Sequence, residues 1–138
     1  MMRILIDTNV LLDVLLSRDP WVTDAARLWA IIETGKVAGY VCASTFTDIF
    51  YVARRLTDLN RARMAVRLCL DTFEVCAIDK ASLELAEQLP GRDFEDNLQL
   101  ASATQYSLDA IVTRDADAFK GSLIPVVSPV DFLASIAE

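Results

Sequence analysis

Short apolar segments typical of β-strands alternate with helix-type segments along the chain, and this alternation constrains the fold more than any other feature. The strand-type segments are 3–6, 40–43, 74–78, 109–113 and 125–128. The helix-type segments are 24–36, 45–56, 59–73, 80–89, 95–107 and a last one that begins at 129. Strands that alternate with helices predict a parallel sheet covered on both faces. We therefore expect one α/β domain over residues 1–138, a three-layer α/β/α sandwich around a parallel sheet of about five strands.

The residue types that are missing exclude several kinds of chemistry. The chain has no histidine, which removes Ser-His-Asp triads, imidazole bases and most zinc sites. Its three cysteines, Cys42, Cys69 and Cys76, have no C-x-x-C spacing, so structural disulfides and a zinc knuckle are not expected. Any catalysis must use carboxylates, lysines, hydroxyls, thiols or a bound ion.

Hydropathy and charge limit the surroundings and the partners. No apolar run approaches the ~18 residues of a membrane span, and the apolar part of the N-terminal segment is too short for a secretory signal. We therefore expect a cytoplasmic protein without a membrane partner. The formal net charge of -7 does not attract nucleic acid, so a nucleic-acid binder needs a local basic patch, bound cations or both.

Aspartates follow or lie near the strand ends at which parallel sheets place their functional crevice. Asp7 comes directly after the first strand segment, and Asp115 and Asp117 come shortly after the fourth. If these two strands are neighbours, as in doubly wound sheets, the acids meet at the carboxyl edge. Asp48 lies one turn into the helix after the second strand, and Asp96 lies near the start of the helix that leads to the fourth.

Each of these acids also has an ordinary structural interpretation. Asp7 could cap the next helix, and Asp48 could interact with a helix dipole. The acids at 93–96 and 115–117 could belong to a solvated helical turn and a loop turn. Together, however, four segments place aspartates near one edge, and crowded carboxylates need compensation. Oxygen ligands without His or Cys select hard cations, so we expect a Mg²⁺ or Mn²⁺ site.

Four segments together resemble the PIN-domain family, and most closely its VapC-type toxins of bacterial toxin–antitoxin pairs. They are LIDTNVLLDVL, STFTDIFYVARR, DFEDNLQLASA and IVTRDADAF, and the resemblance extends to the ending IPVVSPVDFL. It implies an α/β/α sandwich and a Mg²⁺- or Mn²⁺-dependent endoribonuclease that hydrolyses single-stranded RNA. It also implies a cognate antitoxin protein as partner and a homodimer.

The resemblance assigns roles by position. It places the catalytic acids at Asp7, Asp48, Asp96 and Asp115, where many relatives have Glu in place of Asp48. Relatives often carry Asp directly before the Phe of the fourth motif, where this chain has Ala118. The metal ligands are therefore expected at Asp7 and Asp96, with Asp115 and Asp117 as alternatives for a further ligand. The supporting polar residues are Asn9 and Thr113.

A basic segment is the candidate RNA-binding surface. It contains Arg54, Arg55, Arg61, Arg63 and Arg67, with one acid among them. We expect Arg54 and Arg55, which share a helix with Asp48, and also Arg114, to contact RNA. The alternatives are a solvated helical face with ordinary ion pairs, or a surface that contacts an antitoxin.

Other functions fit the sequence less well. A haloacid-dehalogenase-type phosphatase needs a second Asp two residues after the first, where this chain has Asn9. A receiver domain needs a Lys after a late strand, where Arg114 follows 109–113. A PIN-like module that binds RNA or protein without catalysis stays open as an alternative. The motifs do not name an RNA target or an antitoxin.

Overall fold

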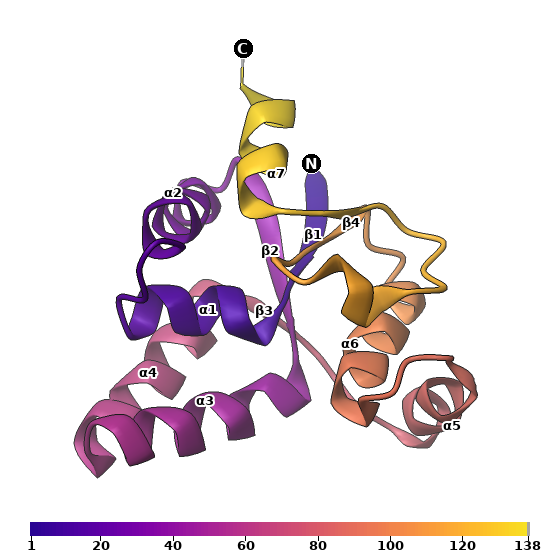
Figure 1. Ribbon diagram of the computed structural model, residues 1–138, viewed down its shortest axis with the longest axis horizontal. Coiled ribbons are helices and arrows are strands. Elements are labelled where there is room, and N and C mark those ends of the chain that lie inside the picture. Colours follow the sequence, from indigo (N-terminus) through magenta and orange to yellow (C-terminus); the bar gives the residue numbers. More distant parts are fainter. Residues whose placement is uncertain (138) are drawn as a thin grey trace.

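Five parallel strands form a single sheet in the computed structural model, which describes residues 1–137. The strands are β1 (Met2–Ile6), β2 (Val37–Cys42), β3 (Glu74–Cys76), β4 (Ala110–Val112) and β5 (Val126–Val127). Their order is β3-β2-β1-β4-β5 (Figure 1). The predicted neighbours β1 and β4 pair directly, with Ile4 opposite Ala110. The expected parallel sheet is confirmed.

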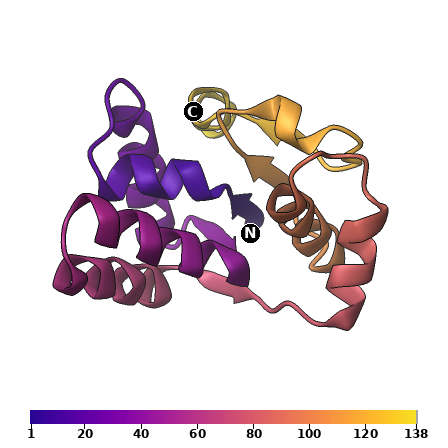
Figure 2. The ribbon, with the colours of Figure 1, turned by 60° about the horizontal axis from the view of Figure 1, so that its bottom comes forward.

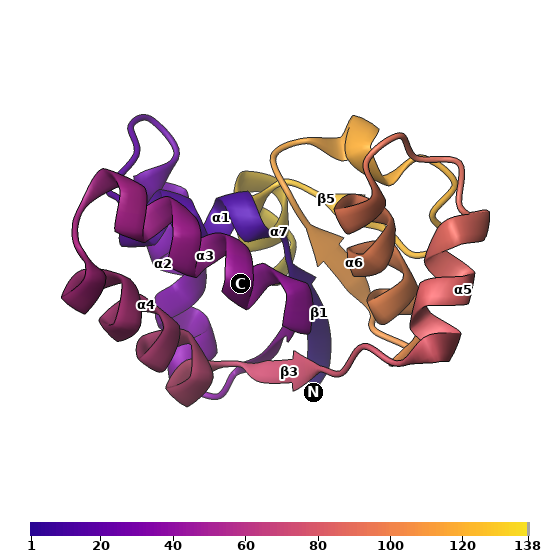
Figure 3. The same ribbon diagram turned by 90° about the horizontal axis from the view of Figure 1, so that it is seen from below.

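The helices cover both faces of this sheet, as Figures 2 and 3 show from two directions. They are α1 (Thr8–Leu15), α2 (Val22–Glu33), α3 (Ala43–Leu56), α4 (Leu59–Thr72), α5 (Lys80–Gln88), α6 (Phe94–Gln105), the short 3-10 helix η1 (Ala116–Phe119) and α7 (Pro129–Ile136). Because α1–α4 lie on one side of the strands and α5 and α6 on the other, the expected three-layer arrangement is also confirmed. Within residues 1–137, no helix has the length and apolar character to cross a membrane.

Alternate side chains of β1 anchor the two halves of the core. Ile4 and Ile6 pack in the larger cluster with residues of α1–α4 and α7, while Leu5 packs with residues of α6 and η1. All three are at most 1% exposed, so the strand is buried on both faces. The carboxyl end of β1 is therefore fixed, and the residue after Ile6 has a defined position.

The strand β2 begins three residues earlier than the sequence predicts, at Val37. The added residues include Gly39, which lies within the strand. A Cβ at this position would lie 2.9 Å from both Ile32 and Phe73, so the glycine allows the helical layer to approach the strand closely.

The buried carboxylate of Asp13 connects α1 to the segment after β4. Asp13 is 1% exposed, and its carboxylate accepts hydrogen bonds from Arg114 Nε (2.8 Å) and Nη2 (3.2 Å). Arg18 Nη1 lies 3.8 Å from the same carboxylate. The Arg114 guanidinium also lies 3.8 Å from the ring centroid of Trp21. A carboxylate at this depth needs such partners, because an unpaired buried charge is costly.

We predict that Asp13→Ala lowers the free energy of unfolding by about 2 to 4 kcal/mol, because it leaves Arg114 and Arg18 without their partner. Urea denaturation measures this change. The matched control is Asp71→Ala, which removes the exposed pair with Arg67 (2.8 Å) and should cost about 0.5 kcal/mol or less. Equal losses in both variants would contradict a structural role for Asp13.

Candidate active site

The carboxylate of Asp7 lies at the carboxyl end of β1 and is 4% exposed. Asp7 occupies the N-cap position of α1, but its side chain makes no capping hydrogen bond. The interpretation of this carboxylate as a helix cap is therefore wrong. Instead, Oδ1 accepts from Gln99 Nε2 (3.1 Å) and Oδ2 accepts from Thr113 Oγ1 (2.8 Å). Both donors are neutral, so the carboxylate is oriented without being neutralised.

Thr113 and Gln99 each make a second hydrogen bond that extends this network. Thr113 Oγ1 accepts from the backbone N–H of Asp115 (2.9 Å), and Gln99 Oε1 accepts from the N–H of Thr8 (3.3 Å). Asp7 is thereby connected to the segment after β4 and to α6. Among the side chains of this network, only that of Gln99 is absent from the sequence prediction. The available signal was an amide among apolar neighbours, three residues after Asp96 and so on the same side of the helix.

The charges of several acids converge on Asp96, in the first turn of α6. The pKa of Asp96 is raised to about 6, first by burial and then by the charges of four other acids. In order of decreasing effect, these are Asp93, Asp7, Asp115 and Asp48. The structure thus brings together acids from the ends of β1 and β4 and from α3 and α6.

Two more of these acids have raised pKa values. Burial raises the pKa of Asp7, and the charge of Asp115 raises it as well. The hydrogen bonds from Thr113 and Gln99 act in the opposite direction, but the net shift is upward. The pKa of Asp48 is raised mainly by burial and to a smaller extent by the charge of Asp93. In the described part of the chain, none of Asp7, Asp48 and Asp96 has a Lys or Arg within ion-pair distance.

A pocket of about 370 Å³ opens beside Asp96. Its lining includes Asp93, Asp115 and Asp117. Asp115 and Asp117 are therefore both near the pocket. The charge of Asp115 is among the largest effects that raise the pKa values of Asp7 and Asp96, and the charge of Asp117 is not, which favours Asp115 over Asp117 as the partner of the other acids.

Asp93 has a structural role that sequence reasoning left among the solvated acids. Its carboxylate accepts the N–H of Asp96 (3.0 Å) and so caps α6. The same carboxylate has the largest charge effect on the pKa of Asp96. Asp93 therefore both starts the helix that carries Asp96 and adds to the negative potential around it.

The three arginines expected to contact RNA lie in different surroundings in the structure. Arg54 and Arg55 are exposed in the last turn of α3, and Arg54 lies about 9 Å farther along the helix axis than Asp48. The guanidinium of Arg114 is bound by Asp13 and lies over the ring of Trp21, and its expected contact with RNA stays a prediction.

Three other residues of the sequence analysis also have defined surroundings. Arg61 pairs with Asp58 (3.9 Å) and Arg67 with Asp71, as the ordinary ion-pair interpretation predicts for the basic segment. Asn9 is exposed in the first turn of α1.

The acids fit a divalent cation by donor type and by charge. All donors are carboxylate oxygens, the set that Mg²⁺ and Mn²⁺ prefer, and a cation would relieve the repulsion that raises the pKa of Asp96. Among residues 1–137, however, no three acidic or cysteine side chains already lie close enough to bind one ion together. Binding a cation would therefore require these side chains to move.

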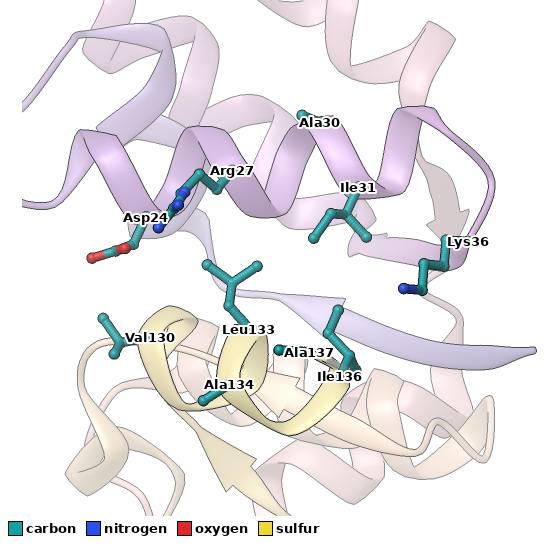
Figure 4. A pocket seen from close by; sticks show the side chains of 10 residues that line it. All are labelled: Asp24, Arg27, Ala30, Ile31, Lys36, Val130, Leu133, Ala134, Ile136 and Ala137. Carbon is teal, nitrogen blue, oxygen red and sulfur yellow. The ribbon is translucent and has the colours of Figure 1, made fainter.

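A larger pocket, of about 600 Å³, lies between α2 and α7 and has a different character (Figure 4). Its side chains are mainly aliphatic, such as Ile31 and Leu133, and Asp24 is its only acid among the described residues. A single carboxylate is a poor ligand set for a divalent cation, so the candidate active site is the pocket beside Asp96.

We predict that Asp96→Asn stabilises the protein in EDTA above about pH 6. Between the ordinary pKa of 3.8 and the folded value of about 6, the native state binds more protons than the unfolded state. The free energy of unfolding therefore falls as the pH rises through this window, and the variant avoids that fall. Urea denaturation across this pH range measures the difference, which should vanish at the acidic end.

Glu95→Gln is the matched control for this prediction, because Glu95 is the adjacent acid in the same helical turn. Its removal should give no stabilisation near neutral pH. A variant Asp96→Asn that is no more stable than the wild type near pH 7 would contradict the repulsion described for the site.

Comparisons with known proteins agree with this fold. No curated protein matches the chain significantly. Among solved structures, a toxin–antitoxin complex from Klebsiella pneumoniae has 24% identity and a TM-score of 0.66, with 91% of this chain and 96% of that chain covered. DNA-bound VapBC from Salmonella typhimurium has 15% identity and a TM-score of 0.72, with 94% and 99% covered.

A third solved structure, Mycobacterium tuberculosis VapC20, is described as a sarcin-ricin loop cleaving toxin. It has 17% identity and a TM-score of 0.66, with 98% of this chain and 96% of that chain covered. At these identities the structures show a shared fold. The family model described as PIN domain matches residues 3–117, which is most of the sequence. The chain belongs to the PIN-domain family.

Proposed function

We propose that this PIN domain is a metal-dependent endoribonuclease that hydrolyses phosphodiester bonds of single-stranded RNA. The observation that carries the proposal is the cluster of uncompensated carboxylates around Asp96, whose pKa is raised to about 6 by burial and by its acidic neighbours. Perturbed acids in a pocket are typical of functional sites. Membership of the PIN-domain family and the likeness to VapC20 support the same activity.

Asp7, Asp96 and Asp115 would hold Mg²⁺ or Mn²⁺, with Asp48 as a ligand directly or through water. When bound, such an ion lowers the pKa of a water molecule and stabilises the charge that develops on the phosphate. The donor set fits because every group is an oxygen ligand and no histidine is required.

The chain itself orients these ligands. Thr113 Oγ1 donates to one oxygen of Asp7 and accepts the backbone N–H of Asp115, so one hydroxyl connects the Asp7 carboxylate to the backbone of Asp115. Gln99 Nε2 holds the other oxygen of Asp7. These neutral contacts set the direction of the Asp7 carboxylate and leave its charge available, as preorganised sites require.

We further propose that the protein is the toxin of a toxin–antitoxin pair that acts in the cytoplasm, with a cognate antitoxin as partner and a homodimer as its assembly. The likeness to toxin–antitoxin complexes from Klebsiella pneumoniae and Salmonella typhimurium supports this role. Hydrolysis would leave a 5′-phosphate and a 3′-hydroxyl, as the family resemblance implies.

A PIN-like module without catalysis is the second candidate. It is favoured by the spacing of the acids, since no three of them within residues 1–137 lie close enough to share one ion. Ala118, which stands where relatives often carry Asp, also favours a module without catalysis. Cleavage and binding distinguish the two candidates, because a module would bind RNA or protein and leave RNA intact.

We predict that the wild-type protein cleaves a mixed pool of single-stranded RNA in Mn²⁺ and leaves it intact in EDTA. Asp96→Asn and Asp115→Asn should each lower the rate by about 100-fold or more, because each removes a ligand charge. Gel analysis of the RNA fragments measures the rates.

Asp117→Asn is the matched control, because Asp117 lines the same pocket but is not among the acids with the largest effects on the pKa values of Asp96 and Asp7. This variant should keep most of the activity. Intact RNA after incubation with folded, Mn²⁺-treated wild type would overturn general ribonuclease activity. An inactive Asp117→Asn beside an active Asp115→Asn would reverse the choice between these two acids.

A further inference from the structure

Two cations, Arg92 and Lys120, line the acid pocket together with Asp96 and Asp115. Arg92 lies just before the Asp93 cap of α6, and Lys120 lies directly after η1. Both side chains belong to exposed residues. The basic segment considered from the sequence contains neither of them, so the acid pocket has its own source of positive charge.

The two loops that carry these cations are held against each other. A Cβ at Gly121 would lie 3.0 Å from Pro90 Cγ, and the φ of Gly121 is +89°, so this turn requires glycine. On the other loop, Asn97 Nδ2 donates to the carbonyl of Gly91 (3.0 Å). Figures 2 and 3 both show the α5–α6 connection beside the η1 segment. Arg92 and Lys120 therefore lie on two loops that pack against each other, and the loop of Arg92 is also fixed to α6 by a hydrogen bond.

Neither cation is neutralised by a neighbouring acid. Within residues 1–137, the ion pairs involve Arg18, Arg61, Arg67, Lys80 and Arg114, and neither Arg92 nor Lys120. This is notable because Asp93, Asp96, Asp115 and Asp117 line the same pocket. The guanidinium of Arg92 and the ammonium of Lys120 are thus available to an anion that approaches the acids.

We propose that Arg92 and Lys120 bind backbone phosphates of single-stranded RNA at the mouth of the acid pocket. A phosphate that reaches the acids must overcome their repulsion and the net charge of -7. Two unpaired cations at the rim supply attraction at that place. Contacts of this kind position the strand and do not read its bases. The choice of RNA rests on the proposed function, whereas the anion-binding geometry does not.

The test is binding of a fluorescently labelled single-stranded RNA, measured by anisotropy at a series of salt concentrations, with EDTA present so that the RNA stays intact. The double variant Arg92→Gln/Lys120→Gln should bind about tenfold more weakly at low salt. The slope of log K against log salt should decrease in magnitude by about 1.4, because two phosphate contacts are lost.

Arg27→Gln/Lys36→Gln is the matched control, since it removes one arginine and one lysine from the lining of the α2–α7 pocket (Figure 4). It changes the net charge equally and should bind RNA like the wild type. In Mn²⁺, the rim variant should show a raised KM with little change in kcat, because its acids are intact.

The inference is overturned if the rim variant and the control bind alike, or if the wild type shows no binding at low salt. Its failure differs from failure of the proposed function. A wild type that cleaves RNA while both double variants bind equally contradicts only the role of Arg92 and Lys120. A wild type that binds RNA through these two cations but never cleaves it contradicts only the nuclease.

Discussion

The position of the Asp7 carboxylate is the constraint on which the rest of the site depends. The residue follows a strand that is buried on both faces, and its backbone N–H donates to the carbonyl of Val112 (3.0 Å) on the neighbouring strand. Its two oxygens are held by Thr113, directly after β4, and by Gln99, in α6. The sheet order that places β4 beside β1 is therefore also what builds the site.

Asp7 and Asp13 show two ways of burying a carboxylate near the same helix. Asp13 is 1% exposed and is paired with Arg114 and Arg18, so its charge is used to hold α1 against the segment after β4. Asp7 is 4% exposed and has only neutral donors, so its charge stays available. The unpaired acid costs folding free energy in the absence of a cation, as functional sites often do.

The fold and much of the site follow from sequence patterns. The strand and helix periods predict the layers, and the carboxyl-edge rule predicts that Asp7 and Asp115 meet. The approach of Asp48 and Asp96 to them depends on how α3 and α6 pack, which local patterns do not contain. Arg114 illustrates the same limit, because only the three-dimensional structure shows that the buried Asp13 binds it.

Contacts between residues far apart in the chain account for the other differences. Gln99 bonds to Asp7 across 92 positions of sequence, and a lone amide in an apolar helix gives little sign of such a partner. Arg92 and Lys120 are separate in sequence and meet at one pocket only because the loops around Gly91 and Gly121 pack together. The basic segment was more conspicuous in sequence, yet Arg61 and Arg67 there are already paired.

The most direct test of a cation site at these acids is a calorimetric titration of the metal-free protein with Mn²⁺, comparing the wild type with Asp7→Asn. The structure predicts that the wild type binds Mn²⁺ and that Asp7→Asn abolishes or greatly weakens this binding while the protein stays folded, because the removed charge is the one fixed by Thr113 and Gln99. Equal Mn²⁺ binding by both proteins, or no binding by the wild type, would contradict the assignment of these carboxylates as a metal site.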